Sequence, residues 1–198
     1  MILQQVNWPQ LSVQTLRDPK AAAADIISWQ IPQAALWMTA AVIAIASTLM
    51  SALSHAAIPL PAPLDTLMIS PFMVFAVIAG AFVLTIYALF WTGRVLGGTG
   101  DLTDLLAVLV WMQALRAVGQ ALVLVAALLA PVLASFLVLF VAVATLWVFV
   151  NFISVGLRLN SLLRAVVVLI VGALVMSLGL SFLLSMFGVS AIGVPSNV

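Results

Sequence analysis

Five long apolar segments dominate the chain, and short polar, glycine-rich or proline-rich segments separate them. The apolar segments cover residues 33–56, 71–91, 103–129, 131–150 and 162–188. An α-helix needs roughly 20 apolar residues to cross the hydrocarbon of a bilayer. The pattern therefore predicts five transmembrane helices within one domain, residues 33–188, followed by a short C-terminal tail, residues 189–198.

The third and fourth segments are separated only by Ala130 and Pro131. One continuous helix over both would be far longer than a bilayer is thick, so a break is required there. We expect a very short turn at Pro131, and a polar joint over residues 151–160 before the fifth span.

Residues 1–32 are more polar and form a separate N-terminal cytoplasmic or interfacial segment. Asp18 followed by Pro19 predicts a helix start, because Asp accepts from free N–H groups and Pro suits the first helical turn. The helix over residues 19–29 has alanine and isoleucine on one side and is too short to span. We expect it at the membrane interface; the alternative is a helix packed on the cytoplasmic loops.

The composition agrees with lipid as the main solvent. Hydrophobic residues make up 66% of the chain and charged residues only 6%, against roughly 25% charged in soluble domains. The predicted fold class is all-α, a polytopic membrane helical bundle with five spans and a short N-terminal interfacial helix. A net charge of +1 without a basic cluster excludes a nucleic-acid partner, because phosphate binding needs clustered cations.

Basic residues indicate the orientation. With the N-terminus inside, the cytoplasmic segments hold Arg17, Lys20, Arg94, Arg158 and Arg164, and the opposite segments hold none. Interfacial tryptophans agree, since the same side holds Trp29, Trp37, Trp91 and Trp147. The bias predicts a cytoplasmic N-terminus and an external C-terminus.

Few residues are available for chemistry. The chain has no Cys and no Glu, and its one histidine, His55, has only Asp65 as a titratable neighbour in sequence. We therefore expect no catalytic residue, no cofactor and no metal site. The run Gly97–Asp101 has some likeness to an anion cradle but lacks its Lys-Ser/Thr and preceding strand, so a connection between two spans is the preferred interpretation.

Arg116 is the polar residue that most needs an explanation, because it lies well inside the third apolar segment. Gln113 and Gln120, at i−3 and i+4, share its helix face. A charge within a bilayer must be paired or hydrated, and no Asp is expected at matching depth. The hypotheses are a structural role, a contact with a lipid headgroup or partner protein, and a transport pathway.

Small residues recur on one helix face in two spans, every four positions in the fifth span and every three or four in the first. The fifth span carries the stripe Ala173, Ser177, Ser181 and Ser185. The first span carries Ala40, Ala44, Ser47, Ser51 and Ser54. Such stripes let helix backbones approach closely in lipid, so we interpret them as packing faces.

Short motifs spread along the chain resemble a known family. They are Leu16-Arg-Asp-Pro19, Trp91-Thr-Gly-Arg-Val-Leu-Gly-Gly-Thr-Gly100, Trp111-Met-Gln113 and Val150-Asn-Phe-Ile153. Together they resemble bacterial members of the Yip family (Ypt/Rab-interacting protein domain). The resemblance implies a five-span, N-in protein of the bacterial inner membrane without catalytic residues. Eukaryotic relatives are implicated in Rab GTPase binding, but their Asp-Leu-Tyr-Gly-Pro signature is absent here, so no Rab binding is inferred.

These observations give three functional hypotheses, none of them enzymatic. The first is a scaffold, assembly factor or accessory subunit that acts by lateral contacts with lipids or other membrane proteins, self-association included. The second is a small transporter or channel component that uses the Gln113/Arg116/Gln120 face. The third is a membrane-shaping or lipid-organising protein.

The basic-residue bias predicts the outcome of cysteine labelling in sealed cells. Because the chain has no cysteine of its own, single cysteines can be placed without background. A cysteine at Ser54 or Ser196 should react with an impermeant maleimide added outside, and one at Thr99 should react only after permeabilisation. Labelling at Thr99 in sealed cells would reject the topology.

Overall fold

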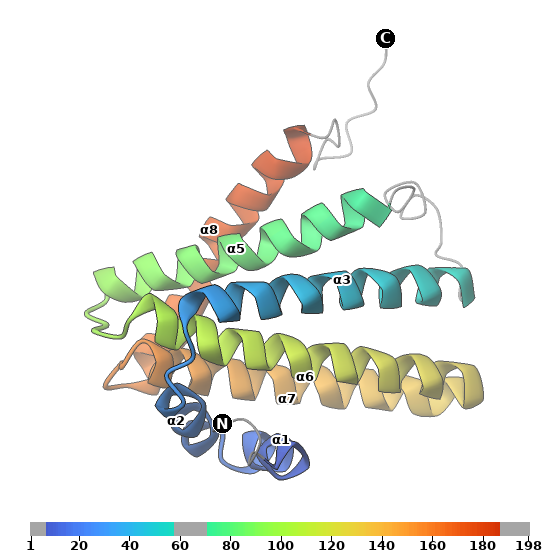
Figure 1. Ribbon diagram of the computed structural model, residues 1–198, viewed down its shortest axis with the longest axis horizontal. Coiled ribbons are helices and arrows are strands. Elements are labelled where there is room, and N and C mark those ends of the chain that lie inside the picture. The colour runs from blue at the N-terminus through green and yellow to red at the C-terminus, as the bar shows by residue number, and fades with distance from the viewer. Residues whose placement is uncertain (1–6, 58–70, 187–198) are drawn as a thin grey trace.

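The structure, a computed structural model, describes residues 7–57 and 71–186, and within them it is entirely helical (Figure 1). The helices are α1 (Trp8–Arg17), α2 (Pro19–Ser28), α3 (Gln33–Ala57), α5 (Pro71–Val95), α6 (Leu102–Leu129), α7 (Pro131–Gly156) and α8 (Leu162–Met186). The five long helices are apolar enough to cross a membrane. The predicted all-α polytopic membrane bundle with five spans is therefore confirmed. Asp65 and the tail at 189–198 lie outside the described residues.

Two short helices, rather than one, precede the first span. The side chain of Asn7 accepts from the N–H of Gln10 at 3.3 Å and begins α1. Asp18 ends α1 and begins α2, because its carboxylate accepts from the N–H of Ala21 at 3.1 Å. The α2 start follows the expected Asp-Pro signal, whereas α1 was not expected. Asn7 and the Pro in the first turn of α1 are an N-terminal capping signal of the same kind.

Helix α7 is longer than its sequence indicates and continues through Asn151 to Gly156. The buried Asn151 amide donates to the carbonyl of Trp147, one turn earlier, at 2.8 Å. This bond satisfies a polar group inside the helix, so the polar sequence does not end it. The joint before α8 is correspondingly shorter than the expected 151–160.

The helices follow a closed order around the bundle. Helix α5 packs most extensively on α8, and α6 on α7; α3 lies against α6 and α5, and α8 also contacts α7. Helix α2 covers the first part of α6 and the last part of α7, and α1 packs on α2 (Figure 1). Towards its C-terminus α8 leans away from α3, α6 and α7 (Figure 1).

One end of the bundle carries five of the six basic residues, at the ends of α1, α2, α5, α7 and α8; we call it the basic end. The fully buried side chains gather there, including Leu105 and Leu106 of α6, Phe152 and Ile153 of α7, and Leu157. Towards the opposite end the apolar side chains of α6, α7 and α8 are largely exposed. The protein core therefore occupies the basic end, and lipid must cover the rest.

Glycines let the α5–α6 connection dock on the end of α7. The N–H groups of Thr99 and Gly100 both donate to the carbonyl of Leu157, each at 3.1 Å. A Cβ on Gly100 would overlap the carbonyl oxygen of Gly156 and lie 2.6 Å from the Cα of Leu157. Two N–H groups that an anion cradle would need are thus already used, which supports the interpretation of this run as a connection.

Helix α2 lies with its apolar face against protein. Ala22, Ala23 and Ile26 are buried, while Lys20 and Asp25 are exposed. This arrangement favours packing on the ends of α6 and α7, the alternative for this helix, over insertion of α2 itself into lipid.

The close approach at Gly100 predicts a large effect of one methyl group. Gly100→Ala should destabilise the protein by several kcal/mol, because the clash is with backbone that cannot move aside. Gly119→Ala is the matched control, since its Cβ would lie at an ordinary 3.7 Å from Val141, and Ala favours a helix by roughly 1 kcal/mol over Gly. Thermal unfolding in mild detergent should give a much lower midpoint for Gly100→Ala only; equal midpoints would contradict the docking.

Candidate functional site

The predicted polar face is built on α6. Gln113, Arg116 and Gln120 follow one another at helical spacing, so the three side chains leave the helix on the same side. They lie just beyond the buried first turns of α6, where the protein core ends. The face is therefore directed into the region where the spans begin to separate.

Two adjoining cavities share this face. The first has a volume of about 760 Å³ and lies between α3, α6 and α7. The second, about 510 Å³, lies between α3, α5 and α6 and reaches α7 and α8. Arg116 and Gln120 line both cavities, and Gln113 lines the second. The three residues singled out from the sequence are thus brought together at the boundary between two cavities.

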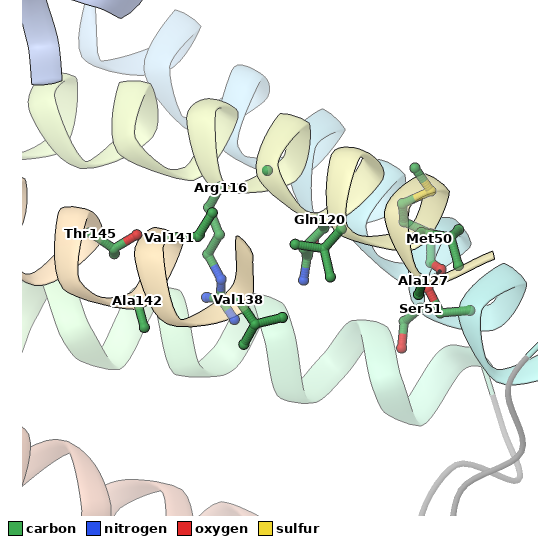
Figure 2. Close-up of a pocket in the computed structure, with 13 residues that line it drawn as sticks. Met50, Ser51, Arg116, Gln120, Ala127, Val138, Val141, Ala142 and Thr145 are labelled. Carbon is green, nitrogen blue, oxygen red and sulfur yellow. Dashed lines mark hydrogen bonds between the residues drawn. The ribbon is translucent and has the colours of Figure 1, made fainter. Parts of the chain in front are cut away.

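The walls of the first cavity are mainly apolar. Figure 2 shows Arg116 and Gln120 extending from α6 in the same direction, with Thr145, Val141 and Ala142 of α7 close to Arg116. Met50 and Ser51 of α3 lie near Ala127, farther along α6 (Figure 2). The cavity is therefore an apolar space with a cation at one end.

The Arg116 guanidinium has no hydrogen bond or ion pair within the part of the chain that the structure describes. Other arginines have contacts: Arg158 pairs with Asp104 at 2.8 Å, and Arg94 lies 5.1 Å from the centre of the Phe90 ring. Arg116 is also exposed. Its N–H donors, of which a guanidinium has five, are available to a molecule that enters the cavities.

The small-residue stripe of α8 is not covered by the residues that the structure describes. Ala173, Ser177, Ser181 and Ser185 are exposed. The close contact with α5 uses the neighbouring glycines instead, since a Cβ on Gly172 would lie 2.8 Å from Leu89, and one on Gly179 would lie 3.2 Å from Leu84. The stripe remains a predicted packing face, now for another molecule. In α3, Ala40 and Ala44 are buried, and Ser47, Ser51 and Ser54 line the cavities.

An aromatic contact that sequence reasoning missed fixes α1 to α6. The indole N–H of Trp111 donates to the hydroxyl of the buried Thr15 at 3.0 Å. Trp8 stacks on Trp111 with ring centres 5.7 Å apart and meets Trp29 edge-on at 6.0 Å. Trp8 and Trp29 in the N-terminal segment indicated that it packs on something. The sequence could not identify the partner, because Trp111 lies about a hundred residues away from Trp8.

The described segments, 7–57 and 71–186, contain no group of side chains suited to bind a metal ion. No three His, Asp, Glu or Cys side chains lie close enough there to hold an ion. His55 lies in the last turn of α3, and Asp65, its expected neighbour, is outside these segments.

Comparison with known proteins gives one match. The Yip1 domain matches residues 13–183, from within α1 to within α8. No curated protein and no solved structure matches the chain.

Because Arg116 has no bond to lose within the described chain, its removal should not unfold the protein. Arg116→Leu should keep or raise the unfolding midpoint in detergent, since an unpaired polar group is replaced by apolar contact. Arg94→Leu, which removes a guanidinium outside the cavities, is the control. A midpoint lowered by more than roughly 4 °C, about 1 kcal/mol for a chain of this size, would show that Arg116 has a structural partner.

Proposed function

The chain belongs to the Yip1 domain family, and from this premise we propose that it is a scaffold, assembly factor or accessory subunit of a membrane complex. In this role it acts by lateral contacts with membrane proteins or lipids and performs no chemistry itself. Yip1 domain proteins are non-enzymatic membrane proteins. That family character supports a role in binding.

The observation that carries the proposal is the Gln113/Arg116/Gln120 face. A guanidinium along a membrane span is costly unless something pairs with it, and the described chain supplies no partner. The cavities beside Arg116 are open enough to admit one. A residue of this kind is explained most simply by a contact with another molecule.

The stripe of Ala173, Ser177, Ser181 and Ser185 gives a second surface for such contacts. It is exposed and lies on α8, whose main neighbours among the described helices are α5 and α7. Small residues allow a foreign helix to approach the backbone closely. The partner in this place is another membrane protein or a second copy of this chain.

We place the protein in a bacterial inner membrane, with its N-terminus cytoplasmic and its C-terminus outside. The basic end of the bundle supports this orientation, because cytoplasmic segments are enriched in Lys and Arg. The bacterial origin rests on the resemblance of the short motifs around Trp91–Gly100 and Val150–Ile153.

A transporter or channel component is the second candidate, because the two cavities meet at Arg116 and Gln120. Their walls are mostly apolar, however, whereas selectivity in a channel or transporter depends on polar or charged groups that line the path. This contrast favours binding over transport.

A membrane-shaping protein is the third candidate, and α1 is the element that supports it. Val13 and Leu16 are exposed on the outer face of α1, next to Arg17. A single ten-residue helix displaces little lipid, so we rank this role below a scaffold.

Photo-crosslinking in native membranes tests the scaffold role. A photoreactive amino acid at Ser181 should give discrete protein adducts, because this position lies on the exposed stripe. The matched control is Leu139, an exposed residue of α7 that lines neither cavity. Mass spectrometry of the adducts identifies the partner; lipid adducts alone at both positions would contradict a scaffold and leave the lipid-organising role.

A further inference from the structure

Four of the five spans carry one tryptophan each in the part near the basic end. Each is on a different span, and at about 1.5 Å per residue each lies roughly 24–30 Å from the helix end opposite the basic end. They are Trp37, Trp91, Trp111 and Trp147. This separation matches the ~30 Å thickness of bilayer hydrocarbon. Because indole rings favour the interface, the four rings mark where the membrane meets water near the basic end.

Helix α1 lies beside Trp111 of α6. It is attached to α6 through the contacts of Trp8 and Thr15 with Trp111. Its outer face exposes Val13 and Leu16, each 49% accessible. An amphipathic helix of this type lies in the interface, with its apolar side chains towards lipid. The exposed apolar face of α1, which lies beside Trp111, therefore supports a membrane boundary near that residue.

This boundary changes the depth assigned to Arg116. Measured along α6 alone, Arg116 is near the middle of the helix. The first turns of α6, Leu105–Val110, are covered by protein and lie outside the boundary. Arg116 is five residues beyond Trp111, about 7–8 Å along the helix. A long arginine side chain can cover that distance, so its guanidinium is within reach of the headgroup layer.

We propose that the two cavities bind one anionic lipid, with its phosphate or carboxylate on Arg116 and an acyl chain in the first cavity. Arg116 supplies an unpaired cation suited to such a group. Val123, Leu124 and Val138 supply apolar wall. Both volumes lie within the roughly 300–1,000 Å³ of pockets for small ligands. The assignment rests on the lateral-contact function, whose ligand it names.

Other occupants fit the site less well. A helix of a partner protein is roughly 10 Å across with its side chains and ~30 Å long in a membrane, far larger than either cavity. A free inorganic phosphate would contact one cation and gain nothing from the apolar walls. It would also lose part of its hydration shell on reaching Arg116, which costs free energy. A lipid matches both the charge and the walls.

Lipid retention measured by native mass spectrometry tests the proposal. The protein is reconstituted in vesicles of equal parts phosphatidylglycerol and phosphatidylcholine, extracted in mild detergent and analysed intact. Wild type should retain one phosphatidylglycerol in preference to phosphatidylcholine. Arg116→Leu should reduce that occupancy about tenfold, the effect of losing one charged hydrogen-bonded contact. Arg116→Lys should retain part of it, and Arg94→Leu, the charge control, should match wild type.

A second variant separates binding from folding. Ala142→Phe fills the first cavity and leaves Arg116 in place, so it should also reduce retention. Equal phosphatidylglycerol retention by wild type, Arg116→Leu and Ala142→Phe would overturn the proposal. Displacement of the lipid by millimolar inorganic phosphate would overturn it in favour of a free-anion site, and a protein bound at Arg116 would overturn it in favour of a partner helix. Crosslinks from Ser181 do not depend on this result, so the scaffold role and the lipid site can fail separately.

Discussion

The docking of the glycine-rich connection on the end of α7 determines the arrangement of the bundle. Leu157 offers one carbonyl oxygen to two N–H groups, those of Thr99 and Gly100. This contact brings together the end of α5, the start of α6 and the end of α7, and the ion pair of Arg158 with Asp104 lies beside it. Backbone polar groups that would otherwise need water are satisfied within the protein at the place where three helices meet.

Glycine is required because two backbones meet there without side chains between them. Gly98 and Gly100 both approach Leu157, and Gly156 approaches the backbone of Leu105. The motifs that carry the family resemblance, Trp91–Gly100 and Val150–Ile153, belong to this same region, and Phe152 and Ile153 are fully buried in it. The residues of these motifs therefore serve the packing of α5, α6 and α7. This is why the motifs indicated a family but contained no reactive group.

Hydropathy and local signals were sufficient for the spans, because a transmembrane helix is specified by its own length and apolarity. Contacts between residues far apart in the sequence could not be predicted from hydropathy and local signals. The start of α1 was marked by Asn7, but its stability depends on Trp111, far away in sequence. Asn151 suggested a joint, and only its bond to Trp147 shows that the helix continues. The Gln113/Arg116/Gln120 face followed from helical spacing, whereas the cavities beside it depend on how α3, α5 and α7 pack around α6.

The distribution of packing along the bundle has a mechanical consequence. Helices α6, α7 and α8 are held firmly at the basic end and are largely uncovered towards the other, and α8 leans outward there (Figure 1). The helices are therefore fixed relative to one another at the basic end. The angle between their far halves is limited mainly by the surrounding lipid and not by protein contacts. We therefore expect bilayer thickness to influence this angle, because adjusting helix tilt costs only fractions of a kcal/mol per ångström of mismatch. A change in tilt would alter the spacing of α6 and α7 and, with it, the width of the first cavity, which Arg116 lines.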